Sequence, residues 1–201
     1  LLVAGLDWRI ILILLLSVAL VVGAVFWLYF FHTPLLEKIL GDHQIERIDT
    51  FVDPTSDVSG PGWQLTQGMI AIGSGQLLGK GFQQGTQTQG KFIPEQHNDF
   101  IFTVIAEEFG FVGASILLCL FIYLIYRMVY IALASQDFYG TYLVAGVIGM
   151  LVFQIYQNIG MTVGLMPVTG INLPFISYGG SSLVSTMLAV GLVLNVGMRR
   201  N

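Results

Sequence analysis

Charged residues are scarce in this sequence. Asp, Glu, Lys and Arg together make up only 10% of the 201 residues, whereas 55% are hydrophobic. A soluble domain carries a much more charged surface, so this composition predicts an integral membrane protein. The formal net charge of −4 argues against nucleic-acid binding, which favours a basic surface, so we expect no nucleic-acid partner.

Cysteine is almost absent. The single Cys119 cannot form a disulfide within the chain, and its place in an apolar run is typical of a small buried hydrophobic side chain. The sequence opens Leu1-Leu2-Val3 without a methionine, which we interpret as a piece of a longer protein. Its first apolar run, 10–31, is too long for the hydrophobic region of a signal peptide.

Long apolar runs dominate instead. Residues 10–31 carry no charge and are long enough to cross a bilayer core of about 30 Å. The same criterion predicts further spans at about 110–132, 138–164 and 181–198. The predicted fold class is therefore an all-α integral membrane protein, with about four transmembrane helices in a single membrane domain over 1–201.

The stretch 99–135 is too long for one span, because it would reach roughly 55 Å as a single helix. It would also place Glu107 and Glu108 deep in lipid. We therefore predict a first helix from about Asn98, which acts as its N-cap, and a bend at Gly110 or Gly113 before the membrane span.

The adjacent carboxylates Glu107 and Glu108 are expected to be shielded from solvent, and buried carboxylates need partners. We interpret them as anchors for an Arg or Lys from helices outside this chain. The alternative is a second acid–base site.

Residues 33–98 form a long polar loop that contains two amphipathic stretches. They predict short helices that either lie on the membrane surface or belong to a small packed lobe outside it. Their apolar positions are Ile45, Ile48 and Val52, and, after Pro61-Gly62, Leu65, Met69 and Ile72.

The basic residues near short connections set the expected orientation. Arg9, Arg127, Arg199 and Arg200 fall on one side of a four-span chain, and that side should be cytoplasmic. The loop 33–98 would then face the exterior. The basic residues of this loop run against the rule, but loops longer than about 60 residues largely escape it. They are Lys38, Arg47, Lys80 and Lys91.

Glu95, His97 and Asp99 cluster where the long loop meets the next apolar segment. A carboxylate at the mouth of a membrane segment suggests function, so Asp99 is our candidate general base; the alternative is a carboxylate that only complements a helix dipole. The three residues would share a face of an extended strand and could hold a divalent cation. No cofactor is otherwise required.

Two other segments carry polar groups. Gly73–Gly81 is rich in glycine but matches neither the Walker nor the dinucleotide motif, although its amides and Lys80 could meet a phosphate. Farther on, Gln154, Gln157 and Asn158 form a polar stripe on one helical face, which should turn toward other helices or a cavity. In the loop that follows, Ser177 could contact a headgroup, and Ser181 or Ser182 is expected to cap the last helix.

Three motifs stand out along the chain: Pro94–Phe102 followed by Glu107–Gly110, Ala71–Gly75 with Gly79–Gly81, and Pro167–Ser182. Together they resemble the SEDS family, which includes RodA, FtsW and sporulation relatives. The family usually has Thr at the position of Asn98. FtsW-type members more often carry Lys at the position of Thr169, and this difference, together with Gly85-Thr86-Gln87, favours the RodA branch.

The resemblance implies the C-terminal half of a membrane glycosyltransferase that polymerises lipid II into peptidoglycan for cell-wall elongation. Asp99 stands at the family's catalytic aspartate. The growing chain on polyprenyl diphosphate is the implied donor, a class B penicillin-binding protein the implied partner, and the bacterial inner membrane the implied location, with Asp99 on the extracytoplasmic side. A lipid-linked precursor flippase and a non-catalytic scaffold for a transpeptidase are the alternatives. The candidate substrate-binding residues are Glu95, His97, Lys80, Ser177, Gln154 and Asn158.

Overall fold

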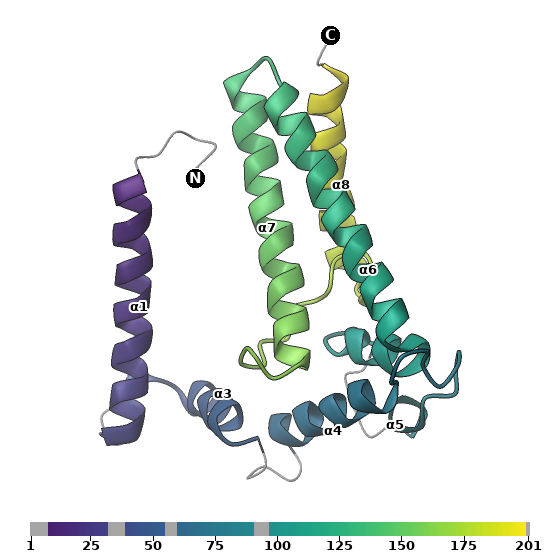
Figure 1. The fold of residues 1–201 in the computed structure, drawn as a ribbon. Coiled ribbons are helices and arrows are strands. Elements are labelled where there is room, and N and C mark those ends of the chain that lie inside the picture. The colour runs from purple at the N-terminus through teal and green to yellow at the C-terminus, as the bar shows by residue number, and fades with distance from the viewer. Residues whose placement is uncertain (1–7, 32–38, 55–59, 91–96, 200–201) are drawn as a thin grey trace. The chain divides into compact units, whose positions relative to one another are not determined.

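The computed structural model describes residues 8–31, 39–54, 60–90 and 97–199 (Figure 1). All regular secondary structure in these ranges is helical, which confirms the predicted all-α fold class. Within the described residues, four helices are long and apolar enough to cross a membrane, and the protein is a multi-pass membrane protein. They are α1 (Trp8–Phe31), α6 (Ile101–Ala134), α7 (Phe138–Thr162) and α8 (Gly180–Met198).

The chain divides into two compact units, 1–48 and 49–201. The first contains α1, which buries none of its side chains within the structure. Because α1 is apolar on every side, its surroundings must be lipid or other membrane helices. The candidate site lies entirely in the second unit.

Helices α6, α7 and α8 form the bundle of the second unit (Figure 1). Their common core consists of Met128 and Ala132 from α6, Val144 and Leu151 from α7, and Val193 from α8. Gly140 lets α7 approach α8 closely, since a Cβ there would lie 3.0 Å from a Val196 methyl group. Small residues at such contacts are typical of membrane helices, which gain stability from close backbone packing.

Two short helices of the long loop were predicted and are confirmed as α3 (Asp42–Val52) and α4 (Pro61–Ser74); a further short helix is α5 (Thr86–Gln89). The predicted apolar face of α4 was wrong in part, because Met69 is exposed while Leu65, Gly68 and Ala71 are buried. A Cβ at Gly68 would lie 3.3 Å from Phe100 and Thr103 atoms. The small side chains therefore turn inward, where α4 packs against α6.

Helix α6 is broken at Gly110, which has φ 66° and ψ −164°. The bend predicted at Gly110 or Gly113 therefore lies at the first of these. The predicted Asn98 cap was wrong, because 97–100 form a turn and Phe100 occupies the N-cap position of α6. The carbonyl of Asn98 is instead bonded to the loop that precedes α8.

The cap predicted for α8 was also wrong. This helix begins at Gly180 with Gly179 at the N-cap, so Ser181 and Ser182 lie within its first turn. The backbone carbonyl of Gly179 already accepts the Leu183 N–H at 2.9 Å, so the helix starts before the serines.

Candidate functional site

Asp99 lies in the turn just before α6, and its side chain is half-buried. Its carboxylate rests against the backbone of Gly170 in the α7–α8 loop, where a Cβ would lie only 3.2 Å from Asp99 Oδ2. Gly170 has φ 69°, a conformation that glycine adopts without strain. The fold thus brings the loop between α7 and α8 up to the predicted catalytic carboxylate.

Asn158 of α7 holds these two segments together. Its Nδ2 donates hydrogen bonds to the Asp99 carbonyl at 2.8 Å and to the Ile171 carbonyl at 2.7 Å. The side chain is completely buried, so the two bonds are protected from water and costly to lose. Asn158 therefore fixes the backbone that carries Asp99 to the α7–α8 loop.

Two more hydrogen bonds tie the same segments, and a third holds Ser177 within its own loop. Ser177 Oγ donates to the Asn98 carbonyl at 2.6 Å and accepts the Leu173 N–H at 2.7 Å. The Tyr178 N–H donates to the His97 carbonyl at 2.9 Å. The backbone carbonyls of three successive residues, His97, Asn98 and Asp99, thus all accept hydrogen bonds. This fixes the backbone of the turn and restricts the directions in which the Asp99 carboxylate can point.

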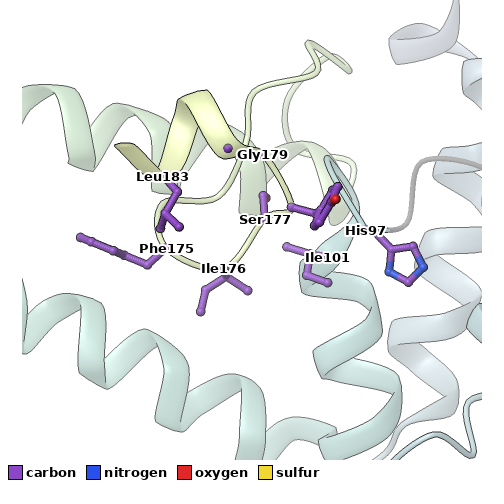
Figure 2. A pocket seen from close by; sticks show the side chains of 9 residues that line it. His97, Ile101, Phe175, Ile176, Ser177, Gly179 and Leu183 are labelled. Atoms are coloured by element: carbon purple, nitrogen blue, oxygen red, sulfur yellow. The ribbon is translucent and has the colours of Figure 1, made fainter. Parts of the chain in front are cut away.

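A pocket of about 470 Å³ opens beside this junction (Figure 2). Apolar side chains form much of its wall, and Ser177 and the exposed His97 add polar groups. Asp99 stands between the lining residues His97 and Ile101 in sequence but is not itself part of the wall. Such a mixed wall suits an amphiphile with an apolar chain and a polar head. The lining residues are His97, Ile101, Phe175 to Gly180, and Leu183.

A second polar cluster surrounds Glu107, which has no solvent exposure. Its carboxylate accepts hydrogen bonds from Lys80 Nζ at 2.8 Å and from the N–H groups of Gln87 and Thr88 at 3.0 Å. The expected burial of Glu107 and Glu108 is confirmed. Glu107 does anchor a basic residue, but the prediction that this residue comes from helices outside the chain was wrong, because the cation is Lys80 of the long loop.

The glycine-rich segment 73–81 closes the break in α6. The N–H groups of Phe111 and Val112 donate to the carbonyls of Gln76 and Leu77, at 2.8 and 3.1 Å. In the other direction, Lys80 N and Gly81 N donate to the carbonyls of Glu107 and Glu108, both at 3.0 Å. Helix ends leave such groups unsatisfied, so this segment completes the ladder that Gly110 interrupts. The amides of Lys80 and Gly81, which belong to the segment predicted as a possible phosphate site, are therefore engaged within the protein.

The family model of FtsW, RodA and SpoVE, described as "Cell cycle protein", matches residues 1–201. The chain belongs to this family. It is 42% identical over 201 residues to "Peptidoglycan glycosyltransferase MrdB" of Escherichia coli strain K12, covering 98% of this chain and 50% of MrdB. It is 45% identical over 154 residues to "Stage V sporulation protein E" of Bacillus subtilis strain 168, covering 77% of this chain and 42% of that protein.

A solved structure of a peptidoglycan synthase complex also contains a chain with a similar fold. The structure, "Structural coordination of polymerization and crosslinking by a peptidoglycan synthase complex", contains a similar chain, with a TM-score of 0.73 and 36% identity; the match covers 98% of this chain and 51% of that one. The resemblance to the SEDS family is confirmed. The chain spans about half the length of the curated relatives it matches.

The predicted substrate-binding residues of this family member fall into different environments. His97 and Ser177 line the pocket beside Asp99. Lys80 is paired with Glu107, and Asn158 holds backbone carbonyls. Gln154 is half-buried on α7, and Glu95 lies outside the described residues. Within the described ranges, no group of three His, Cys, Asp or Glu side chains could hold a metal; the divalent-cation site, which included Glu95, stays a prediction.

The polar stripe on α7 was predicted to face other helices or a cavity, and Gln157 and Asn158 are both buried. Gln157 Nε2 donates to the Pro167 carbonyl and to Thr169 Oγ1, both at 3.1 Å. The bonding of Asn158 to the Asp99 carbonyl was missed. The sequence showed only two neighbouring amide side chains, Gln157 and Asn158, on an apolar helix, and this pattern does not reveal which groups they bond.

Replacing Asn158 by Asp should loosen the turn that carries Asp99 and lower the polymerisation activity proposed below by at least about tenfold in the complete protein. The new carboxylate has nearly the same shape but cannot donate to the carbonyls of Asp99 and Ile171, and a lost buried hydrogen bond costs about 1–3 kcal/mol. Gln44→Glu, the same amide-to-carboxylate change at an exposed residue of α3, is the control. Wild-type rates for Asn158→Asp would contradict the positioning role.

Replacing Lys80 by Met should destabilise the protein by about 3–5 kcal/mol, because it leaves the buried Glu107 carboxylate without its cation. Glu107→Gln should cost less, since Lys80 retains 26% of its side-chain exposure and can reach water. The double variant should recover part of the loss. Unfolding of the detergent-solubilised protein measures all three, and additive losses would show that the two side chains are not coupled.

Proposed function

We propose that this chain forms the catalytic part of a peptidoglycan glycosyltransferase that polymerises lipid II into glycan strands for cell-wall elongation. The observation that carries the proposal is the position of the Asp99 carboxylate, which lies against Gly170 next to a partly apolar, partly polar pocket. A hydrogen bond from Asn158 to the backbone carbonyl of Asp99 fixes this position. The relatives named peptidoglycan glycosyltransferase support it.

In the proposed reaction Asp99 is the general base. Its carboxylate takes the proton of the GlcNAc 4-hydroxyl of the acceptor lipid II as that oxygen attacks the anomeric carbon of the growing chain. The bond from that carbon to polyprenyl diphosphate breaks, and the diphosphate leaves with the electron pair. The attack inverts the anomeric centre. One carboxylate is sufficient, because a diphosphate needs little protonation to leave.

The proposed location is the bacterial inner membrane, with the long loop and Asp99 on the extracytoplasmic side. Arg127 lies about two turns before the end of α6 and Arg199 follows the end of α8, whereas Asp99 precedes the start of α6. Both arginines are exposed, and basic residues favour the cytoplasmic side. A class B penicillin-binding protein is the proposed partner. The similar chain from a peptidoglycan synthase complex supports this assignment.

The decisive experiment uses the complete protein in liposomes with lipid II. We expect glycan polymer, resolved by gel electrophoresis, in the absence of any other polymerase. Movement of labelled lipid II across the bilayer without polymer would instead favour the flippase. If neither occurs while the transpeptidase still binds, the protein is a scaffold. Either result would overturn the proposed enzyme activity.

A further inference from the structure

A second polar pocket lies at the opposite end of the bundle from Asp99. It has a volume of about 400 Å³ and lies between the α6–α7 turn and the last turns of α8. Figure 1 shows both of these segments at the end of the bundle that is away from α4 and α5. The pocket is lined by Ser135, Gln136, Asp137, Tyr139, Gly140, Leu143, Leu192, Asn195, Val196 and Arg199.

The pocket has one carboxylate and one guanidinium in its wall, and they do not pair with each other. In the described parts of the chain, the ion pairs within 4.0 Å are His43–Glu46 and Lys80–Glu107. Asp137 Oδ1 accepts one long hydrogen bond, from Tyr139 N at 3.4 Å. Because an ionised carboxylate offers about four acceptor positions, Asp137 can bind a further donor. Both charges are exposed and available to a ligand.

The pocket changes from polar to apolar along the bundle axis. Asp137 and Arg199 lie at its outer end, whereas Leu192 lies nearly two turns deeper on α8 and Leu143 more than one turn deeper on α7. At about 1.5 Å per residue, α7 is roughly 37 Å long, which exceeds the hydrocarbon core of about 30 Å. The charged end therefore lies at headgroup depth, where the exposed Tyr139 is also typical of the interface.

We propose that this pocket binds a zwitterionic phospholipid whose headgroup carries a primary ammonium, such as phosphatidylethanolamine. The phosphate would meet the Arg199 guanidinium and the ammonium would donate to the Asp137 carboxylate, as charge-assisted hydrogen bonds. One acyl chain would follow Leu143 and Leu192 into the bilayer. An anionic headgroup would satisfy Arg199 but leave Asp137 facing a like charge, and a choline headgroup has no N–H to donate.

The test is native mass spectrometry of the complete protein in detergent, titrated with phosphatidylethanolamine, phosphatidylglycerol and phosphatidylcholine of identical acyl chains. We expect phosphatidylethanolamine to bind about tenfold more tightly than either of the others, since one charge-assisted bond is worth roughly that factor. Asp137→Asn should remove this preference while still capping α7, because Asn is an equally good N-cap. Arg199→Gln should weaken binding of all three lipids about tenfold.

Arg127→Gln is the matched control, since it removes the same charge from an exposed position of α6 outside the pocket. It should leave all three affinities unchanged. Equal affinities for the three lipids, unchanged phosphatidylethanolamine binding in Asp137→Asn, or an equal loss in Arg127→Gln would each overturn the proposal. The readout does not depend on glycosyltransferase activity, so it stands or falls independently of the proposed function.

Discussion

Polymerisation of lipid II should fall by about 10²–10⁴-fold when Asp99 is replaced by Asn in the complete protein. The amide is nearly the same size as the carboxylate, but it cannot accept the proton of the attacking hydroxyl. The turn should keep its conformation, because the hydrogen bonds from Asn158 and Ser177 do not use the Asp99 side chain. They are donated to the backbone carbonyls of Asp99 and Asn98. Initial rates with labelled lipid II measure the effect.

Two controls test whether the loss of activity is specific to the Asp99 carboxylate. Asp53→Asn is the same change at an exposed residue just after α3 and should leave the rate unchanged. The Asp99→Asn protein should remain folded and should still bind the proposed transpeptidase partner, because the backbone bonds of the turn are kept. A rate for Asp99→Asn within about threefold of wild type would exclude Asp99 as the base, because general-base catalysis contributes far more than that.

Replacing Gly110 by Ala should destabilise the protein by about 3 kcal/mol or more. At φ 66° and ψ −164° the backbone is in a region that is essentially restricted to glycine and costs other residues about 1–3 kcal/mol. A Cβ would also collide with Gly79 N and with the Leu77 carbonyl. The segment 73–81 would have to move, and the four backbone bonds that close the break in α6 would be lost with it.

The measurement is thermal unfolding in detergent, with the surviving monodisperse fraction read by size-exclusion chromatography. Gly146→Ala is the control, since a Cβ there meets nothing within 4 Å and Ala favours a helix over Gly by about 1 kcal/mol. It should be neutral or slightly stabilising. A Gly110→Ala protein as stable as wild type would show that α6 can continue through residue 110 without the break.

The break in α6 was predictable because length and charge could be read from the sequence alone. A continuous helix over 99–135 was too long for one span and placed two carboxylates in lipid, and Gly110 was one of two residues that could bend it. What closes the break could not be predicted. The amides of Lys80 and Gly81 look like those of any glycine-rich loop until their acceptors on α6 are known.

The same distinction applies to the site. Asp99 stood out because acidic residues are rare in an apolar chain, and its motif resembles a family signature. Asn158 did not stand out as its anchor, because the residues it joins, Asp99 and Ile171, lie 59 and 13 positions away in sequence. Lys80 looked available for substrate, yet it is the cation of the buried Glu107.

Composition, run length and local motifs therefore specified a multi-span helical membrane protein, the bend in α6 and the candidate base, since each of these follows from the properties of neighbouring residues. The three-dimensional packing alone decided which polar groups are consumed in holding the structure and which remain to face a ligand. A buried polar group is satisfied by whichever segment the fold brings to it, and chain order does not encode that pairing.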